Sequence, residues 1–151
     1  MKPQSGLANW RWAWFLPAIA EMIAISCLSS FSVLPTLPSV LSFDKLQHAL
    51  AYFVLASLMW LGFARGTNVR SAIQTAVLSW GGTVCFGAVD EVHQRFVPGR
   101  QADILDLLAD AVGAGFACFC IRYVSGLRSK EGRESAWRMR TKDSKWWTRE
   151  E

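Results

Sequence analysis

AVDEVHQRFVPGRQADILDLLAD, residues 88–110, is a dense run of ionisable side chains that lies between two long apolar segments. Charged side chains at a membrane boundary are costly to place and commonly serve a function. Within this run Pro98-Gly99 is a tight-turn signal, because Pro fixes one backbone dihedral and Gly permits a positive φ. We therefore expect the flanking segments to form an antiparallel helical hairpin with its charged side chains gathered near the turn.

The whole chain is apolar, with 52% hydrophobic and only 19% charged residues among 151, against about 25% charged in a soluble domain. A membrane-spanning helix needs roughly 17–25 residues. Four runs meet this length, at about residues 12–31, 46–64, 72–92 and 104–124. The expected fold is an all-α membrane protein: an antiparallel bundle of four transmembrane helices over residues 1–124, followed by a basic tail. The tail, residues 125–151, is expected to be either disordered or a helix on the membrane surface.

The first run could instead be a cleaved signal peptide, since basic residues precede it. Glu21 interrupts its apolar core, however, and the run is long for a signal sequence. An uncleaved helix is therefore favoured.

Basic residues are distributed unevenly along the chain. Residues 122–151 hold nine of the 16 Lys and Arg, and residues 32–44 hold none. Others precede the first run and occupy the loop between the second and third runs. The positive-inside rule then puts both termini in the cytoplasm and residues 32–44 and 93–103 outside a bacterial inner membrane. Because the basic tail directly follows an apolar run, membrane lipids are the expected partner and nucleic acid is not.

Polar residues recur on single helical faces at corresponding ends of the second, third and fourth runs. Residues three or four positions apart share a face at about 100° per residue. Small residues continue these faces and permit close helix approach in lipid. We expect the three faces to meet in a polar pocket open to the outer side. The expected binding residues are Asp44, Lys45, His48, Tyr52, Glu91, His93, Gln94, Arg95, Arg100, Asp103, Asp106 and Asp110.

The ionisable groups leave two kinds of role open. His48 is either a proton carrier or ligand, since imidazole titrates near neutrality, or a helix-interface residue bonded to an acid. Arg95 and Arg100 either hold a phosphate or carboxylate by bidentate bonding or neutralise Glu91 and Asp103 within the hairpin. The candidates for acid/base catalysis are His48, Asp90, Glu91, Asp106 and Asp110.

Metal and disulfide chemistry are not expected. On a helix Glu91 and His93 diverge by about 160°, so of the acids near His93 only Asp90 could cooperate with it. With two histidines in the chain and no ligand-spaced cysteines, zinc is the weaker interpretation, and we expect no metal and no cofactor. The cysteines are expected to be small packing residues; they are Cys27, Cys85, Cys118 and Cys120.

Three pieces of this pattern together resemble the VanZ-like family of membrane proteins. They are Asp44-Lys45-x-x-His48-x-x-x-Tyr52, then Asp90-Glu91-x-His93-Gln94-x-Phe96-Val97-Pro98-Gly99-Arg100, then Asp103-x-x-Asp106 with Gly113-Ala114. The likeness covers about residues 28–120. It implies a small multi-pass protein of the bacterial inner membrane, linked through the family's founding member to teicoplanin resistance. The chain departs from the family pattern at Asp110, where Asn is usual.

Two functions fit these features. The first is an envelope-associated accessory protein that binds an anionic lipid-linked or glycopeptide-type ligand through outward arginines above a polar pocket. The second is a membrane enzyme that acts on a lipid-linked envelope substrate, with an Asp or His as general base and Arg as anion clamp. A transporter is disfavoured because four spans with a one-sided pocket offer no inverted repeat. The sequence leaves the ligand and the oligomeric state open.

Overall fold

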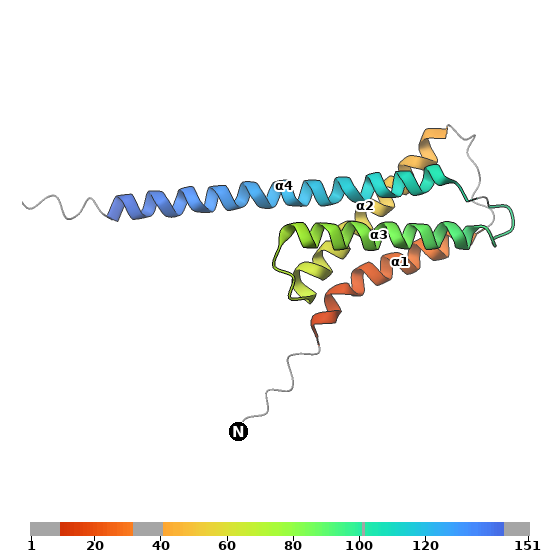
Figure 1. The fold of residues 1–151 in the computed structure, drawn as a ribbon, viewed down its shortest axis with the longest axis horizontal. Helices are drawn as coiled ribbons and strands as arrows, with labels where there is room; N and C mark the ends of the chain where they lie inside the picture. Colours follow the sequence, from red (N-terminus) through yellow and green to blue (C-terminus); the bar gives the residue numbers. More distant parts are fainter. Residues whose placement is uncertain (1–9, 32–40, 101, 144–151) are drawn as a thin grey trace, which may run out of the picture. The chain divides into compact units, whose positions relative to one another are not determined.

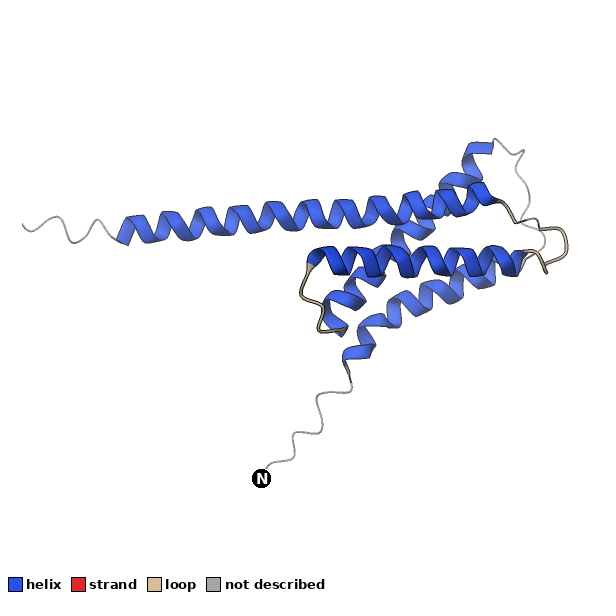
Figure 2. Cartoon of the chain, in the orientation of Figure 1, coloured by secondary structure: helices blue, strands red, loops and turns tan. Residues whose placement is uncertain are grey.

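The computed structural model describes residues 10–31, 41–100 and 102–143, and every regular element within them is a helix (Figures 1 and 2). A 3-10 turn, η1 (Arg11–Phe15), leads into α1 (Leu16–Ser29). Three longer helices follow: α2 (Leu41–Gly66), α3 (Ala72–Gln94) and α4 (Ile104–Asp143).

Four helical segments of the described chain are long and apolar enough to cross a membrane. Their bounds are Arg11–Ser29, Lys45–Gly66, Ala72–Gln94 and Ile104–Trp137. These segments confirm the predicted all-α fold with four spans.

The chain divides into two compact units at Phe119. The first unit holds η1, α1, α2, α3 and the first turns of α4. In the second, α4 continues as a regular helix to Asp143, and its side chains are exposed from Arg122 to Trp137. The described part of the basic tail is therefore helical, while residues 144–151 lie outside the described part.

The first unit buries small and polar side chains and turns apolar ones outward. Val77 and Val89 of α3 are 61% and 66% exposed. In water such a helix would leave apolar surface hydrated, whereas in lipid the same surface meets acyl chains and small buried residues let helices pack closely. The buried face of α3 consists of Thr75, Ser79, Thr83, Gly87, Asp90, Glu91 and Gln94.

Helices α2 and α4 meet at Gly113 with their backbones in close approach. A Cβ atom at this position would lie 2.0 Å from the carbonyl oxygen of Ala49, far inside any permitted contact. Glycine is therefore required there, in keeping with the small-residue contacts of membrane helices. This contact holds the first turns of α4 against α2, where Lys45 and His48 project.

The connection between α3 and α4 contains the predicted tight turn. The amide of Arg100 donates to the carbonyl of Val97 at 3.1 Å, and Gly99 has a φ of 82°. Pro98 and Gly99 thus occupy the central positions of a type II turn, which requires a positive φ at its third residue.

Basic side chains gather at the other end of α3, beside the α2–α3 loop. Arg11 donates hydrogen bonds to the Asn68 side chain, at 2.8 Å, and to the Thr67 carbonyl. The guanidinium of Arg65 lies 4.7 Å from the centre of the Trp14 ring, in a cation–π contact. The first unit therefore has one basic end and, at the Pro98-Gly99 turn, one end rich in acids.

Candidate functional site

An ion-pair network joins the starts of α2 and α4. Lys45 donates to Asp103 Oδ2 at 2.7 Å and also to Asp106 Oδ1. Asp103 directly precedes α4 and caps it, since its Oδ1 accepts from the Leu105 amide at 2.9 Å. The hydrogen bond from Lys45 holds the pKa of Asp103 below its ordinary value, so this carboxylate is charged at neutral pH.

His48 and Asp110 form a second polar contact between α2 and α4, one turn further along. His48 Nδ1 lies 3.0 Å from Asp110 Oδ1, and Asp110 is fully buried. The imidazole also stacks on Tyr52, with ring centroids 6.3 Å apart. An acid that fixes one ring nitrogen sets the orientation and tautomer of the imidazole, as is common at catalytic and metal-binding histidines.

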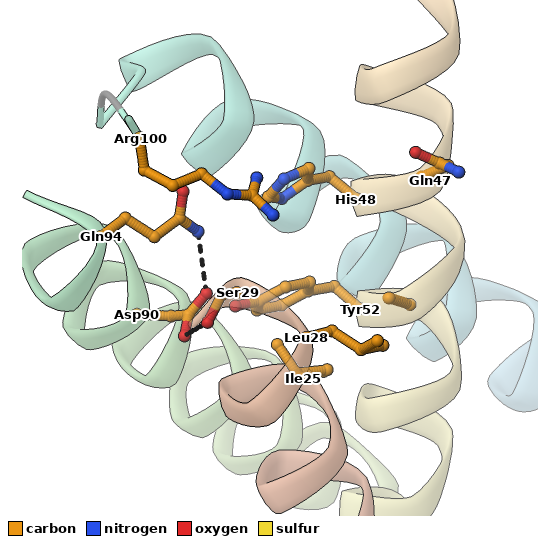
Figure 3. A pocket seen from close by; sticks show the side chains of 10 residues that line it. Ile25, Leu28, Ser29, Gln47, His48, Tyr52, Asp90, Gln94 and Arg100 are labelled. Atoms are coloured by element: carbon orange, nitrogen blue, oxygen red, sulfur yellow. Dashed lines mark hydrogen bonds between the residues drawn. The ribbon is translucent and has the colours of Figure 1, made fainter. Parts of the chain in front are cut away.

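Asp90 is held by α1 and by its own helix. Ser29, at the end of α1, donates to Asp90 Oδ1 at 2.8 Å, and Gln94 donates to Asp90 Oδ2 at 3.0 Å (Figure 3). Both oxygens of this buried carboxylate are therefore satisfied.

Glu91 connects the last turn of α3 to the start of α4. Its Oε2 accepts a hydrogen bond from the Asp103 amide at 2.9 Å. Its other oxygen, Oε1, is buried without a hydrogen-bond partner among the described residues, and so is Oδ2 of Asp110. Two of the buried acids therefore each keep one unsatisfied oxygen, which is costly in a medium without water.

A cavity of about 290 Å³ opens among these groups. Arg100 reaches into it from the turn, while Ile25 and Leu28 of α1 line the side away from Arg100 (Figure 3). The Tyr52 ring points from α2 towards Ser29 (Figure 3). The cavity is thus amphipathic, with a cation on one side and aliphatic groups on the other. Its lining is completed by Gln47, His48, Ala51, Asp90 and Gln94.

Other residues expected in the pocket lie away from this cavity. His93 is exposed, and its Nε2 is 3.1 Å from Ser30 Oγ. Arg95 is also exposed and does not line the cavity. Asp106 is buried against Lys45 beside the cavity, and the side chain of Asp44 falls outside the described part of the chain.

Neither Ser29 nor the aliphatic lining from α1 was predicted from the sequence to belong to the site. A signal was present, since Ser29 and Ser30 end the first apolar run at the side where the acids gather. Serine is common in membrane helices, however, because its hydroxyl can bond to its own helix. Ser29 does so as well, with its Oγ 3.2 Å from the Ser26 carbonyl.

The four cysteines are free. Cys118 is buried and its thiol points to the Ala76 carbonyl, 3.7 Å away, as expected of a packing residue. Cys27 and Cys85 are instead exposed on the outer surface of their helices, so they do not pack within the unit.

The structure has four candidate membrane spans among its described residues, and its buried polar side chains gather where α2 and α4 begin and α3 ends. These features define a small multi-pass helical membrane protein. The chain matches the VanZ/LLP1 family over residues 7–125 and belongs to that family. This match confirms the resemblance and extends it to η1 and α1. Comparisons with curated proteins and with solved structures gave no significant match.

Proposed function

We propose that this protein is an envelope-associated accessory protein that binds an anionic, lipid-linked or glycopeptide-type ligand in the cavity beside Arg100. One observation carries the proposal: a guanidinium group lines a cavity whose opposite side is aliphatic. A ligand with a charged head and an apolar chain complements both sides at once.

The charge pattern favours an anion. Lys45 is already matched by two carboxylates, whereas Arg100 is directed into the cavity. Its planar fork suits phosphate or carboxylate through two parallel hydrogen bonds. Asp90, which also lines the cavity, directs its oxygens to Ser29 and Gln94.

The cavity size favours a lipid-linked ligand over an entire glycopeptide. A volume of about 290 Å³ is at the lower end of ligand pockets, which measure about 300–1,000 Å³. This space suits a phosphate head and a few methylene groups. Leu28 lines the cavity and is 57% exposed, so the aliphatic side continues onto the lipid-facing surface, where a chain would extend.

We place the cavity on the outer face of a bacterial inner membrane, with both termini inside. Arg11 and Arg65 lie at the opposite end of α3 from the turn, and the positive-inside rule assigns that end to the cytoplasm. The ligand would then reach the protein from the extracytoplasmic leaflet.

The alternative is a membrane enzyme that acts on a lipid-linked envelope substrate by acid/base chemistry. The His48–Asp110 contact supports it, because an acid-oriented imidazole at the cavity wall has the arrangement of a general base. The two functions differ in their response to His48→Gln. An enzyme would lose turnover and keep substrate binding, whereas an accessory protein has no turnover to lose.

The experiment is a comparison of Arg100→Lys with Arg95→Lys in purified protein. The probe is short-chain phosphatidylglycerol, with inorganic phosphate and teicoplanin as separate arms. Because Lys keeps the charge and loses the planar fork, we expect Arg100→Lys to bind the lipid about tenfold more weakly, a change of about 1.4 kcal/mol. Arg95→Lys should bind as the unmodified protein does. Equal binding by both variants would contradict the proposal, as would phosphate binding with no preference for the lipid.

A further inference from the structure

His48 of α2, Glu91 of α3 and Asp110 of α4 come together from three helices within the first unit. Each offers one ligand atom, and these atoms all lie within 4.8 Å of one another. From the sequence we expected no metal site, because only Asp90 could cooperate with His93 on the same helix. The sequence predicts His48, Glu91 and Asp110 in one polar pocket, and the packing of the bundle brings their ligand atoms within reach of a single ion.

Burial distinguishes this cluster from a group of surface acids. Asp110 is fully buried and Glu91 is 7% exposed. In each carboxylate one oxygen is held, by His48 or by the Asp103 amide, and the other has no hydrogen-bond partner among the described residues. A buried carboxylate oxygen without a partner is unfavourable, because it has lost its hydrogen bonds to water and gained none in exchange. A cation bound by the cluster would give the two carboxylates a shared partner.

The local charges favour a divalent ion. Lys45, the nearby cation on α2, is engaged with Asp103 and Asp106. The imidazole of His48 contacts Asp110 and lies within 4.8 Å of the Glu91 ligand atom. Buried acids in lipid require a counter-charge or a proton.

Gly87 on α3 packs closely against this cluster. A Cβ atom there would lie 2.9 Å from Asp110 Oδ2, the unsatisfied oxygen, and 3.0 Å from the Tyr52 ring. A side chain at position 87 would therefore crowd that oxygen, so the cluster requires glycine beside it.

We propose that His48, Glu91 and Asp110 bind a divalent transition-metal ion of the Zn²⁺ class. One imidazole nitrogen with two carboxylates suits Zn²⁺, Mn²⁺ or Fe²⁺, whereas Ca²⁺ and Mg²⁺ take sets made of oxygen alone. Ligand atoms around tetrahedral Zn²⁺ lie about 3.4 Å apart, so the widest pair, which is no more than 4.8 Å apart, would need to approach by at most about 1.4 Å. Three protein ligands leave a fourth position open, as in catalytic zinc sites.

This site shares His48 with the cavity of the proposed function, but its other two ligands do not line that cavity. Arg100 lines the cavity and is not among the three ligands. Arg100→Ala removes none of the three metal ligands, so it should abolish lipid binding while Zn²⁺ binding remains saturable. The two proposals can therefore fail separately.

The test uses the full chain, purified in detergent, stripped with a chelator and titrated with Zn²⁺ by calorimetry. We expect one Zn²⁺ per chain, a rise in Tm on binding, and the visible absorption of ligand-bound Co²⁺ when that ion replaces Zn²⁺. His48→Gln and Glu91→Gln should weaken binding by at least about tenfold, since even changes outside the ligand set cost 10–100-fold.

Two matched variants serve as controls. His93→Gln removes the other histidine of the chain, which is exposed, and Glu21→Gln removes a half-buried acid of α1. Both should bind Zn²⁺ as the unmodified protein does. The proposal is overturned if the unmodified protein shows no saturable binding, or if His48→Gln and Glu91→Gln bind Zn²⁺ as tightly as the two controls. If His48→Gln fails to fold, the isosteric Glu91→Gln and the unmodified protein still decide the outcome.

Discussion

Replacing Gly113 by Ala tests the contact that holds α4 against α2. The new Cβ atom would lie 2.0 Å from the carbonyl oxygen of Ala49. Because Cβ atoms essentially never come closer than 3.0 Å, the two backbones must separate by at least about an ångström. Neither atom belongs to a flexible side chain, so no rotamer change relieves the clash. The separation would also stretch the contacts of Lys45 and His48 with α4.

Overpacking of this kind costs about 1–3 kcal/mol, and a backbone clash belongs at the upper end of that range. A loss of about 3 kcal/mol corresponds to a fall in Tm of about 6–12 °C for a chain of this size. The assay is thermal unfolding of purified protein in detergent, followed by the loss of the monodisperse peak in size-exclusion chromatography.

Gly81→Ala is the matched control, because nothing lies within 4 Å of a Cβ atom at that position of α3. It should be neutral or slightly stabilising, since Ala favours a helix over Gly by up to about 1 kcal/mol. A Gly113→Ala variant as stable as Gly81→Ala would refute the close approach of α2 and α4, and with it the geometry of the site.

Three further predictions follow from the same geometry. Lys45→Met should lower the free energy of unfolding by about 3–5 kcal/mol, because it leaves buried Asp106 without its counter-charge. Adding Asp106→Leu should restore most of the lost stability. A double variant as unstable as Lys45→Met would contradict the ion pair. Asp103→Asn should destabilise the protein at neutral pH. A carboxylate with a lowered pKa stabilises the fold above its ordinary pKa of 3.8. The difference in Tm between Asp103→Asn and the unmodified protein should therefore shrink as the pH falls below that value. A difference independent of pH would be inconsistent with the Lys45 contact. The topology is tested in a chain whose native cysteines are replaced by serine. An impermeant thiol reagent applied to intact cells should label Phe96→Cys in the exposed turn and spare Asn68→Cys in the α2–α3 loop. The reverse labelling would place the cavity in the cytoplasm.

The sequence was a good guide to the helices because apolar length and helix signals agree. Ser71 precedes the third run, and its hydroxyl accepts from the Gln74 amide, so α3 begins at Ala72 as expected. The end of α4 was harder to place. Hydropathy falls after about residue 124, yet the helix continues to Asp143 because Lys, Arg, Glu and Ala are good helix formers.

The site was predictable as helical faces but not as pairs of residues. The helical repeat of 3.6 residues places His48 on one face of its helix and Asp110 on one face of another. It does not determine which acidic side chain each basic side chain contacts. That choice depends on the rotation and height of the helices, which the Gly113 contact with Ala49 sets. The contribution of α1 through Ser29 depends on the same packing.

Native mass spectrometry of the protein released from its membrane shows whether the cavity beside Arg100 holds an anionic lipid. We expect a bound phospholipid on the unmodified protein and on Arg95→Ala, because Arg95 is exposed and does not line the cavity. The same adduct should be lost from Arg100→Ala at equal protein yield. An adduct that survives Arg100→Ala undiminished, or its absence from all three proteins, would contradict the claim.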